Sequence, residues 1–197
     1  MTAVLETDRI AMADESDELT LDKMFETLEK MPVPEGIKVE IVEGNIFMSP
    51  QRDTHWTITL DIIRQLDGTY AYNKIKSDVR FDFPGHLNGF ACDVVALSKD
   101  ATMDAKKHWH YSDIEFVAEV ISKGTAANDY GPKKATYAAA GVPVYVIADP
   151  YTGRCHVYTE PKGDEYSTEL TVAFGTDIDL TGTPVGLTLK TGEFPRD

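Results

Sequence analysis

The sequence predicts a mixed α/β (α+β) domain in which a mixed central β-sheet is flanked by helices and extended by additional strands near the C-terminus. Three observations predict this fold class. Short runs rich in Val, Ile, Phe and Tyr alternate with segments of helical periodicity. A strand, helix, strand unit in the second half favours a parallel strand pair, because parallel strands need a crossover connection. No internal repeat or long linker divides the 197 residues, which fits one domain with a sizeable core.

The first elements are a helix and a hairpin. Apolar residues at helical spacing predict a short helix over residues 19–31, with Thr20 suited to the N-cap position. Residues 37–50, IKVEIVEGNIFMSP, have the alternation of two strands joined at Glu43 and Gly44. We therefore expect a β-hairpin there.

Further helices and strands follow the hairpin. A mainly helical pattern runs over residues 52–70 and is closed by Gly68, and a third helical stretch covers about 129–140. Six runs have strand character: 74–83, 90–97, 115–121, 144–149, 154–160 and 167–174. The third helix lies between EFVAEVI and VYVIAD, so the strands formed by these two runs should be parallel.

Composition limits the class of protein. Apolar residues make up 42% of the chain, enough for a core, yet no apolar run reaches the roughly 18 to 20 residues that cross a bilayer. Residues 1–18 are acidic and predict a flexible tail, so we place a single domain at residues 19–197. These first residues have no pattern of a secretory signal, which predicts a cytoplasmic protein. Cys92 and Cys155 are too few for a disulfide framework.

The net charge of -14 argues against tight nonspecific binding to nucleic acid, although a local basic patch or a bound cation can reverse the field near a site.

Two carboxylates stand inside apolar strands. Asp93 lies in FACDVVAL and Glu119 in FVAEVI. Burying an ion costs several kcal/mol unless it is paired, hydrogen-bonded or bound to a metal. If the two strands are neighbours, both carboxylates can converge on one hard cation, which prefers oxygen ligands. In the alternative interpretation each carboxylate reaches solvent or meets an Arg or Lys.

A lysine on the third helix points to the same place. Tyr130, Lys133, Tyr137 and Ala138 share one helical stripe, which should face the sheet. The Lys133 ammonium would then lie near the two carboxylates, where it could orient water or stabilise phosphate charge. Lys134 borders the same stripe. Both lysines could instead extend along apolar surface to solvent.

At this point the sequence resembles a known family. Asp93 followed by Glu119 and a lysine is similar to the arrangement of PD-(D/E)XK nucleases. The string EVISKGTAANDYGPKKATYAAAGVPVYVIADP resembles the Uma-two family of restriction-endonuclease-like proteins. The resemblance extends upstream to VEIVEGNIFMSP and His55, and it covers roughly residues 21–150.

The resemblance implies a restriction-endonuclease-like fold with a metal site. Asp93 and Glu119 would hold magnesium or manganese, and the lysine of the family's helix, here Lys133, would complete the site. The chain departs from the superfamily pattern at Ile121, where most such nucleases carry a lysine. Lys123 is a weaker substitute, so the choice among Lys133, Lys134 and Lys123 stays open.

The resemblance also suggests auxiliary residues and a function. Glu40 and His55 become candidates beside the metal, although Glu40 alone would indicate an exposed strand position and His55 an ordinary histidine at a helix start. The implied activity is a metal-dependent endonuclease that hydrolyses DNA phosphodiester bonds. The net charge motivates an alternative, a catalytically silent acidic interaction module on the same fold. A third hypothesis adds a partner protein that supplies the positive surface, and the fold family makes a homodimer plausible.

Overall fold

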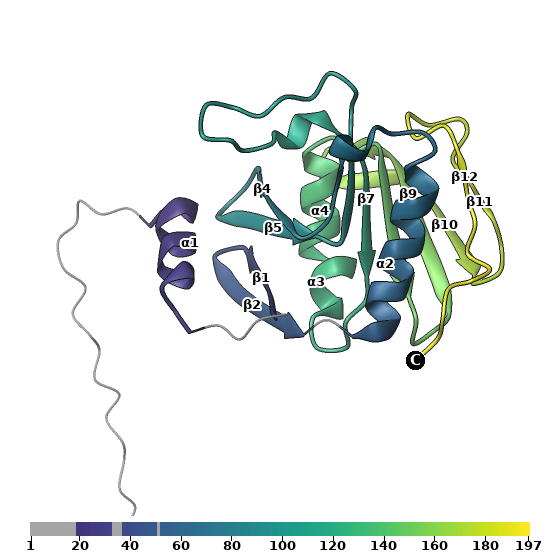
Figure 1. Ribbon diagram of the computed structural model, residues 1–197, viewed down its shortest axis with the longest axis horizontal. Coiled ribbons are helices and arrows are strands. Elements are labelled where there is room, and N and C mark those ends of the chain that lie inside the picture. The colour runs from purple at the N-terminus through teal and green to yellow at the C-terminus, as the bar shows by residue number, and fades with distance from the viewer. Residues whose placement is uncertain (1–18, 33–36, 51) are drawn as a thin grey trace, which may run out of the picture.

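The computed structural model of the chain describes residues 19–32, 37–50 and 52–197. The flexible acidic tail predicted at 1–18 lies outside this part of the chain. Helices cover both faces of a central sheet, and a smaller sheet lies beside it (Figure 1). Among the described residues, no helix is long and apolar enough to cross a membrane.

The larger sheet has six strands. Their order is β10 (Glu165–Ala173), β9 (Arg154–Lys162), β8 (Val144–Asp149), β7 (Ile114–Val120), β6 (Val94–Leu97) and β3 (Ile75–Lys76). β7 and β8 are parallel, with Glu119 opposite Ile147, whereas the other neighbouring pairs are antiparallel. The mixed central sheet, its parallel pair and its additional C-terminal strands are thus confirmed.

The smaller sheet has four antiparallel strands. Their order is β2 (Asn45–Pro50), β1 (Ile37–Val42), β5 (Asn88–Cys92) and β4 (Val79–Phe83). The predicted hairpin is present as β1 and β2, and its turn residues Glu43 and Gly44 both have positive φ, 49° and 75°. Two-residue hairpin loops of this kind match the twist of the flanking strands. A separate pair, β11 (Ile178–Asp179) and β12 (Thr188–Leu189), follows β10.

Two runs that the sequence predicts as single strands are each divided between the two sheets, so these predictions are wrong. Residues 90–97 form the end of β5 and all of β6, with a bend at Asp93. Residues 74–83 form β3 and β4, separated by a turn in which Asp78 has φ 53°. At both places the chain leaves one sheet and enters the other, and apolar patterning carries no signal for that change.

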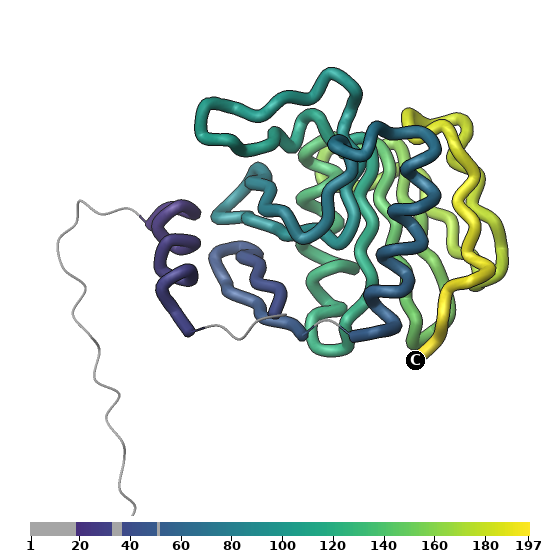
Figure 2. The backbone as a smooth tube through the Cα atoms, in the orientation of Figure 1, coloured from purple at the N-terminus to yellow at the C-terminus, as the bar shows by residue number. Residues whose placement is uncertain are grey.

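Helices pack on both faces of the larger sheet. α2 (Asp53–Leu66) places Ile58, Ile62 and Leu66 against one face, where Val94 and Ala118 belong to the same core cluster. The residues after β10, yellow in Figure 2, run along the outside of this layer, and Lys190 donates its amide hydrogen to Gln65 of α2. α1 (Leu21–Glu29) instead covers the outer face of the hairpin, with Met24 and Leu28 against Ile41.

The opposite face is covered by two short helices rather than the single helix predicted over 129–140. α3 (Ala126–Tyr130) and α4 (Pro132–Ala139) are separated at Gly131, whose φ and ψ of -117° and -101° are not helical. Pro132 explains the break, because proline disfavours helical geometry at the preceding residue and is well tolerated in the first turn. Single 3-10 turns, Tyr72–Lys74 and Tyr111–Asp113, precede β3 and β7.

Candidate functional site

Asp93 occupies the bend where the chain passes from β5 to β6. Its side chain is 2% exposed and therefore needs partners. Oδ2 accepts hydrogen bonds from the Val120 amide at 2.7 Å and lies 3.0 Å from His55 Nε2. Oδ1 lies 2.7 Å from Lys38 Nζ. The bend thus places this carboxylate between the two sheets, in contact with β1, β7 and α2.

Glu119, in β7, lies beside it. The Tyr137 hydroxyl donates to Oε1 at 2.5 Å, and Lys133 Nζ lies 2.7 Å from the same oxygen. Oε2 is 3.3 Å from the Asp93 amide nitrogen and 3.4 Å from Lys38 Nζ. The structure therefore brings the two predicted carboxylates together through a shared lysine and a direct hydrogen bond.

Lys133 lies on the sheet-facing side of α4, where its helical stripe predicts it. Only 1% of the side chain is exposed, so it does not extend to solvent. Its ammonium contacts Glu119, Asp129 at 3.0 Å and Glu40 at 3.1 Å. Glu40, on β1, also accepts the Ala91 amide hydrogen at 3.1 Å. Although burial opposes the charge, the surrounding carboxylates raise the pKa of Lys133 well above its ordinary value.

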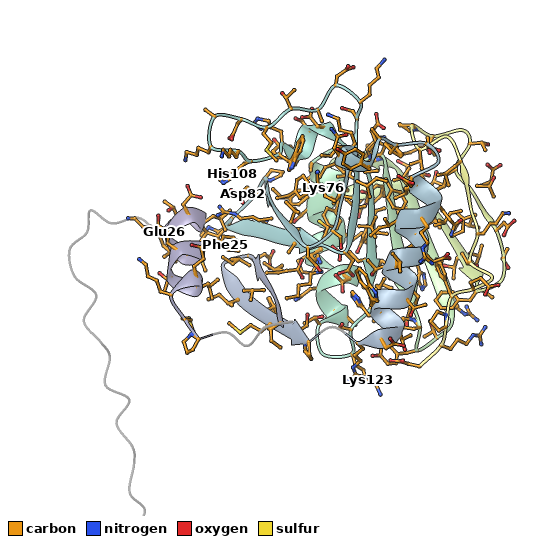
Figure 3. The ribbon with its side chains drawn as sticks, in the orientation of Figure 1. Phe25, Glu26, Lys76, Asp82, His108 and Lys123 are labelled. Carbon is orange, nitrogen blue, oxygen red and sulfur yellow. The ribbon has the colours of Figure 1, made fainter. Side chains whose placement is uncertain are left out.

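Of three further candidates from the sequence, His55 contacts Asp93, whereas Lys134 and Lys123 do not join the cluster. His55 is buried because it falls on the same stripe of α2 as Ile58 and Ile62. Lys134 Nζ lies over the Tyr158 ring at 4.9 Å from its centroid. Lys123 extends away from the body of the protein (Figure 3). Neither Lys134 nor Lys123 makes an ion pair with a carboxylate among the described residues.

Three residues of the site were not singled out from the sequence: Lys38, Asp129 and Tyr137 as a hydrogen-bond donor. Lys38 and Glu40 alternate along β1, so both point to one face of the hairpin. Asp129 and Tyr137 lie four residues before and after Lys133, which is the spacing of neighbours on a helix face. The sequence shows these spacings and so indicates which residues share a face. It does not show whether that face is directed toward the site or toward solvent.

The protonation of the acids follows from their partners. Burial opposes ionisation of Asp93, but the charge of Lys38 and the hydrogen bond from His55 hold its pKa well below the ordinary range. For Glu119 burial is the larger effect and raises the pKa to about 7, against the charges of Lys133 and Lys38. Burial likewise raises the pKa of Asp129. Burial lowers the pKa of His55, but Asp93 outweighs this and raises it above 6.5.

The donor chemistry of this cluster fits a divalent cation. Its four carboxylates face two ammonium groups, which leaves two negative charges when all six groups are ionised. Carboxylate oxygens are the ligands that magnesium and manganese prefer. As the side chains stand, no group of three or more His, Cys, Asp or Glu residues in the described part of the chain is arranged to hold a metal ion. The Lys38 ammonium lies between Asp93 and Glu119.

The chain is similar to a known family and to solved structures. A family model described as "Uma2: Putative restriction endonuclease" matches residues 25–192. The fold is similar to that of a putative nuclease belonging to DUF820 from Anabaena variabilis ATCC 29413, with a TM-score of 0.69 and 13% sequence identity, covering 90% of this chain and 97% of that chain. At this identity the likeness shows the fold alone, and it confirms the predicted fold class. No curated protein matches the chain.

Proposed function

The chain belongs to the Uma2 family, as its sequence resemblance predicts, and from this premise we propose that it is a metal-dependent endonuclease that hydrolyses phosphodiester bonds in DNA. The observation that carries the proposal is the convergence of Asp93 and Glu119, both almost fully buried, in a pocket that also contains Glu40 and His55. A protein that needed only a stable fold would lose little by placing apolar residues there, since buried ion pairs are weak contributors to stability.

Each residue has a distinct role in this proposal. Asp93 and Glu119 would hold magnesium or manganese, which supplies an activated water and neutralises charge on the phosphate. Lys133 is a positioning residue, because its ammonium is already occupied by carboxylates and it does not line the pocket. It fixes Glu119 from the helix side, as the Val120 amide fixes Asp93 from β7.

His55 lines the pocket, and one of its ring nitrogens is buried without a partner in the described part of the chain. Nε2 contacts Asp93, whereas the buried Nδ1 has no hydrogen-bond partner within the described residues. A buried polar atom without a partner is unusual and favours a ligand or water at that place. We assign His55 to orienting Asp93 through Nε2 and to contacting a water molecule or a phosphate oxygen through Nδ1.

The test is cleavage of supercoiled plasmid DNA with magnesium or manganese. Asp93→Asn preserves the shape of the side chain but removes its charge, and it should reduce cleavage at least a hundredfold. Asp164→Ala, an exposed acid in the turn between β9 and β10, is the matched control and should cleave like the parent. Equal cleavage by Asp93→Asn and the parent would refute the proposed site.

The net charge of -14 supports a second candidate, an acidic interaction module without turnover. Such a module has no need to bind a divalent metal. Calorimetry with manganese separates the two functions: binding at micromolar to low millimolar concentration supports the nuclease, and no binding supports the module.

A further inference from the structure

We propose that Lys38 is a resident cation of the metal site, whose ammonium occupies the space between Asp93 and Glu119 until a divalent metal displaces it. This inference rests on the proposed function. It adds a residue that neither the sequence pattern nor the family match assigns, and it concerns how the site is loaded.

The position of the ammonium is the first argument. Lys38 Nζ lies 2.7 Å from Asp93 Oδ1, 3.4 Å from Glu119 Oε2 and 3.7 Å from Glu40 Oε1. A positive group surrounded by oxygens of three carboxylates is in the place where a metal bound by the same carboxylates would be. Two cations cannot share that space without a large repulsion in a buried site.

The space left in the pocket is the second argument. With Lys38 in place, the cavity volume of the pocket is about 10 Å³. That is room for about one water molecule. Magnesium usually keeps several of its water ligands. A hydrated metal therefore requires one side chain of the cluster to move.

Lys38, not Lys133, is the lysine of the cluster that lines the pocket. Lys133 is 1% exposed and held by Glu119, Asp129 and Glu40, whereas Lys38 is 7% exposed and lines the pocket. Its contact with Asp93 is short, but its distances to Glu119 and Glu40 are longer. Lys38 also belongs to β1, which lies next to the edge strand of the smaller sheet rather than in the core of the larger one. On displacement, its four-carbon side chain can carry the ammonium toward the opening of the pocket.

The experiment measures manganese binding without DNA, by the electron paramagnetic resonance of free Mn²⁺, in the full chain. Lys38→Met keeps the length of the side chain and removes its charge, and it should bind Mn²⁺ at least tenfold more tightly than the parent. Lys38→Arg keeps the charge and should stay within about threefold of the parent. Lys134→Met, a lysine outside the site, is the matched control and should match the parent. Adding Asp93→Asn to Lys38→Met should abolish the gain.

A thermal measurement covers the case in which Lys38→Met is poorly folded, because removing the ammonium leaves Asp93 with less compensation. Without metal the variant should melt below the parent, and Mn²⁺ should raise its melting temperature more than that of the parent. If the variant is unfolded without metal, Mn²⁺ should restore its circular dichroism spectrum, and failure to do so would overturn the inference.

The outcomes separate this inference from the proposed function. Equal Mn²⁺ affinity of the parent and Lys38→Met would overturn the role of Lys38 and leave the nuclease proposal intact. Absence of Mn²⁺ binding by both proteins at millimolar concentration would overturn both. Tighter binding by Lys38→Met that Asp93→Asn removes supports the displacement.

Discussion

Replacing Lys133 by Met should destabilise the protein by about 3 to 5 kcal/mol, the usual result of removing one partner of a buried ion pair. The structure supports the upper part of this range. The ammonium contacts Glu119, Asp129 and Glu40, at distances of 2.7 to 3.1 Å, and the first two are buried. Met conserves the volume, so the loss reflects charge rather than a cavity.

The loss of stability in Lys133→Met should also depend on pH, because Lys133 compensates the negative charge of buried carboxylates and their ionisation changes with pH. In the parent the pKa of Glu119 is about 7, and without Lys133 it should be higher. A carboxyl whose pKa is raised in the folded state destabilises the fold increasingly as pH rises, until the pH passes the folded-state value. In the parent the destabilisation caused by Glu119 stops increasing near pH 7, whereas in Lys133→Met it goes on increasing to a higher pH. The difference in stability should therefore be larger at pH 8 than at pH 6.

Urea unfolding in metal-free buffer, followed by circular dichroism, measures this difference. With a slope of about 2 kcal/mol per molar urea, the midpoint should fall by roughly 2 M. Lys134→Met should change stability by less than about 0.5 kcal/mol, as expected for a substitution away from buried networks. Adding Glu119→Gln to Lys133→Met should recover part of the loss. A loss below about 1 kcal/mol for Lys133→Met, or one independent of pH, would refute the idea that this lysine compensates buried acids.

Two further substitutions test the packing around the site. Tyr137→Phe removes only the hydroxyl that donates to Glu119 and should cost about 1.5 to 3 kcal/mol, the range for a hydrogen bond to a charged group; an unchanged urea midpoint would contradict it. Gly89→Ala would place a Cβ 2.6 Å from the Phe25 ring and should cost about 1 to 3 kcal/mol by forcing α1 away from the smaller sheet. Thermal unfolding measures the loss of stability of Gly89→Ala, with Gly182→Ala as the control, because a Cβ at Gly182 would meet nothing within 4 Å. Equal melting temperatures of the two variants would contradict the predicted clash between the new Cβ and Phe25.

Local periodicity was sufficient to predict much of the fold. The runs that became β7 and β8 are almost entirely buried, as the apolar sequence indicates, and the helical stretch between them fixes their parallel direction. The stripe containing Lys133 faces the sheet because the positions three and four residues further on, Thr136 and Tyr137, are buried with it. Both conclusions need only neighbours along the chain.

The change of sheet at Asp93 needs more than that. The residues on both sides are apolar, and neither glycine nor proline marks a bend. The bend exists because β5 pairs with β1 and β4 in the smaller sheet, whereas β6 pairs with β7 in the larger sheet, and both β1 and β7 are distant in the sequence. Asp93 was identified as a costly residue, but its position between two sheets depends on tertiary pairing that the pattern does not encode.

Lys38 shows a second limit. In IKVEIV, alternating charged and apolar residues indicate a strand with one solvent face, and the charged side chains are normally on it. Here α1 covers the face of Val39 and Ile41, which leaves the face of Lys38 and Glu40 toward the larger sheet. The sequence correctly predicts a strand at IKVEIV. Whether its charged face is directed toward solvent or toward the protein depends on which neighbouring element supplies charges of opposite sign.

The same ions that form the candidate site also join the two sheets. Glu40 and Lys38 come from the smaller sheet, Glu119 from the larger sheet, and Lys133 from the helix behind it, while Asp93 lies at the crossing point. Loss of any one of them should therefore weaken the fold. A divalent metal bound at this place would add contacts between the sheets and stabilise the folded state by mass action. Metal binding should consequently raise the stability of the parent, and it should do so only while Asp93 is ionised and in place.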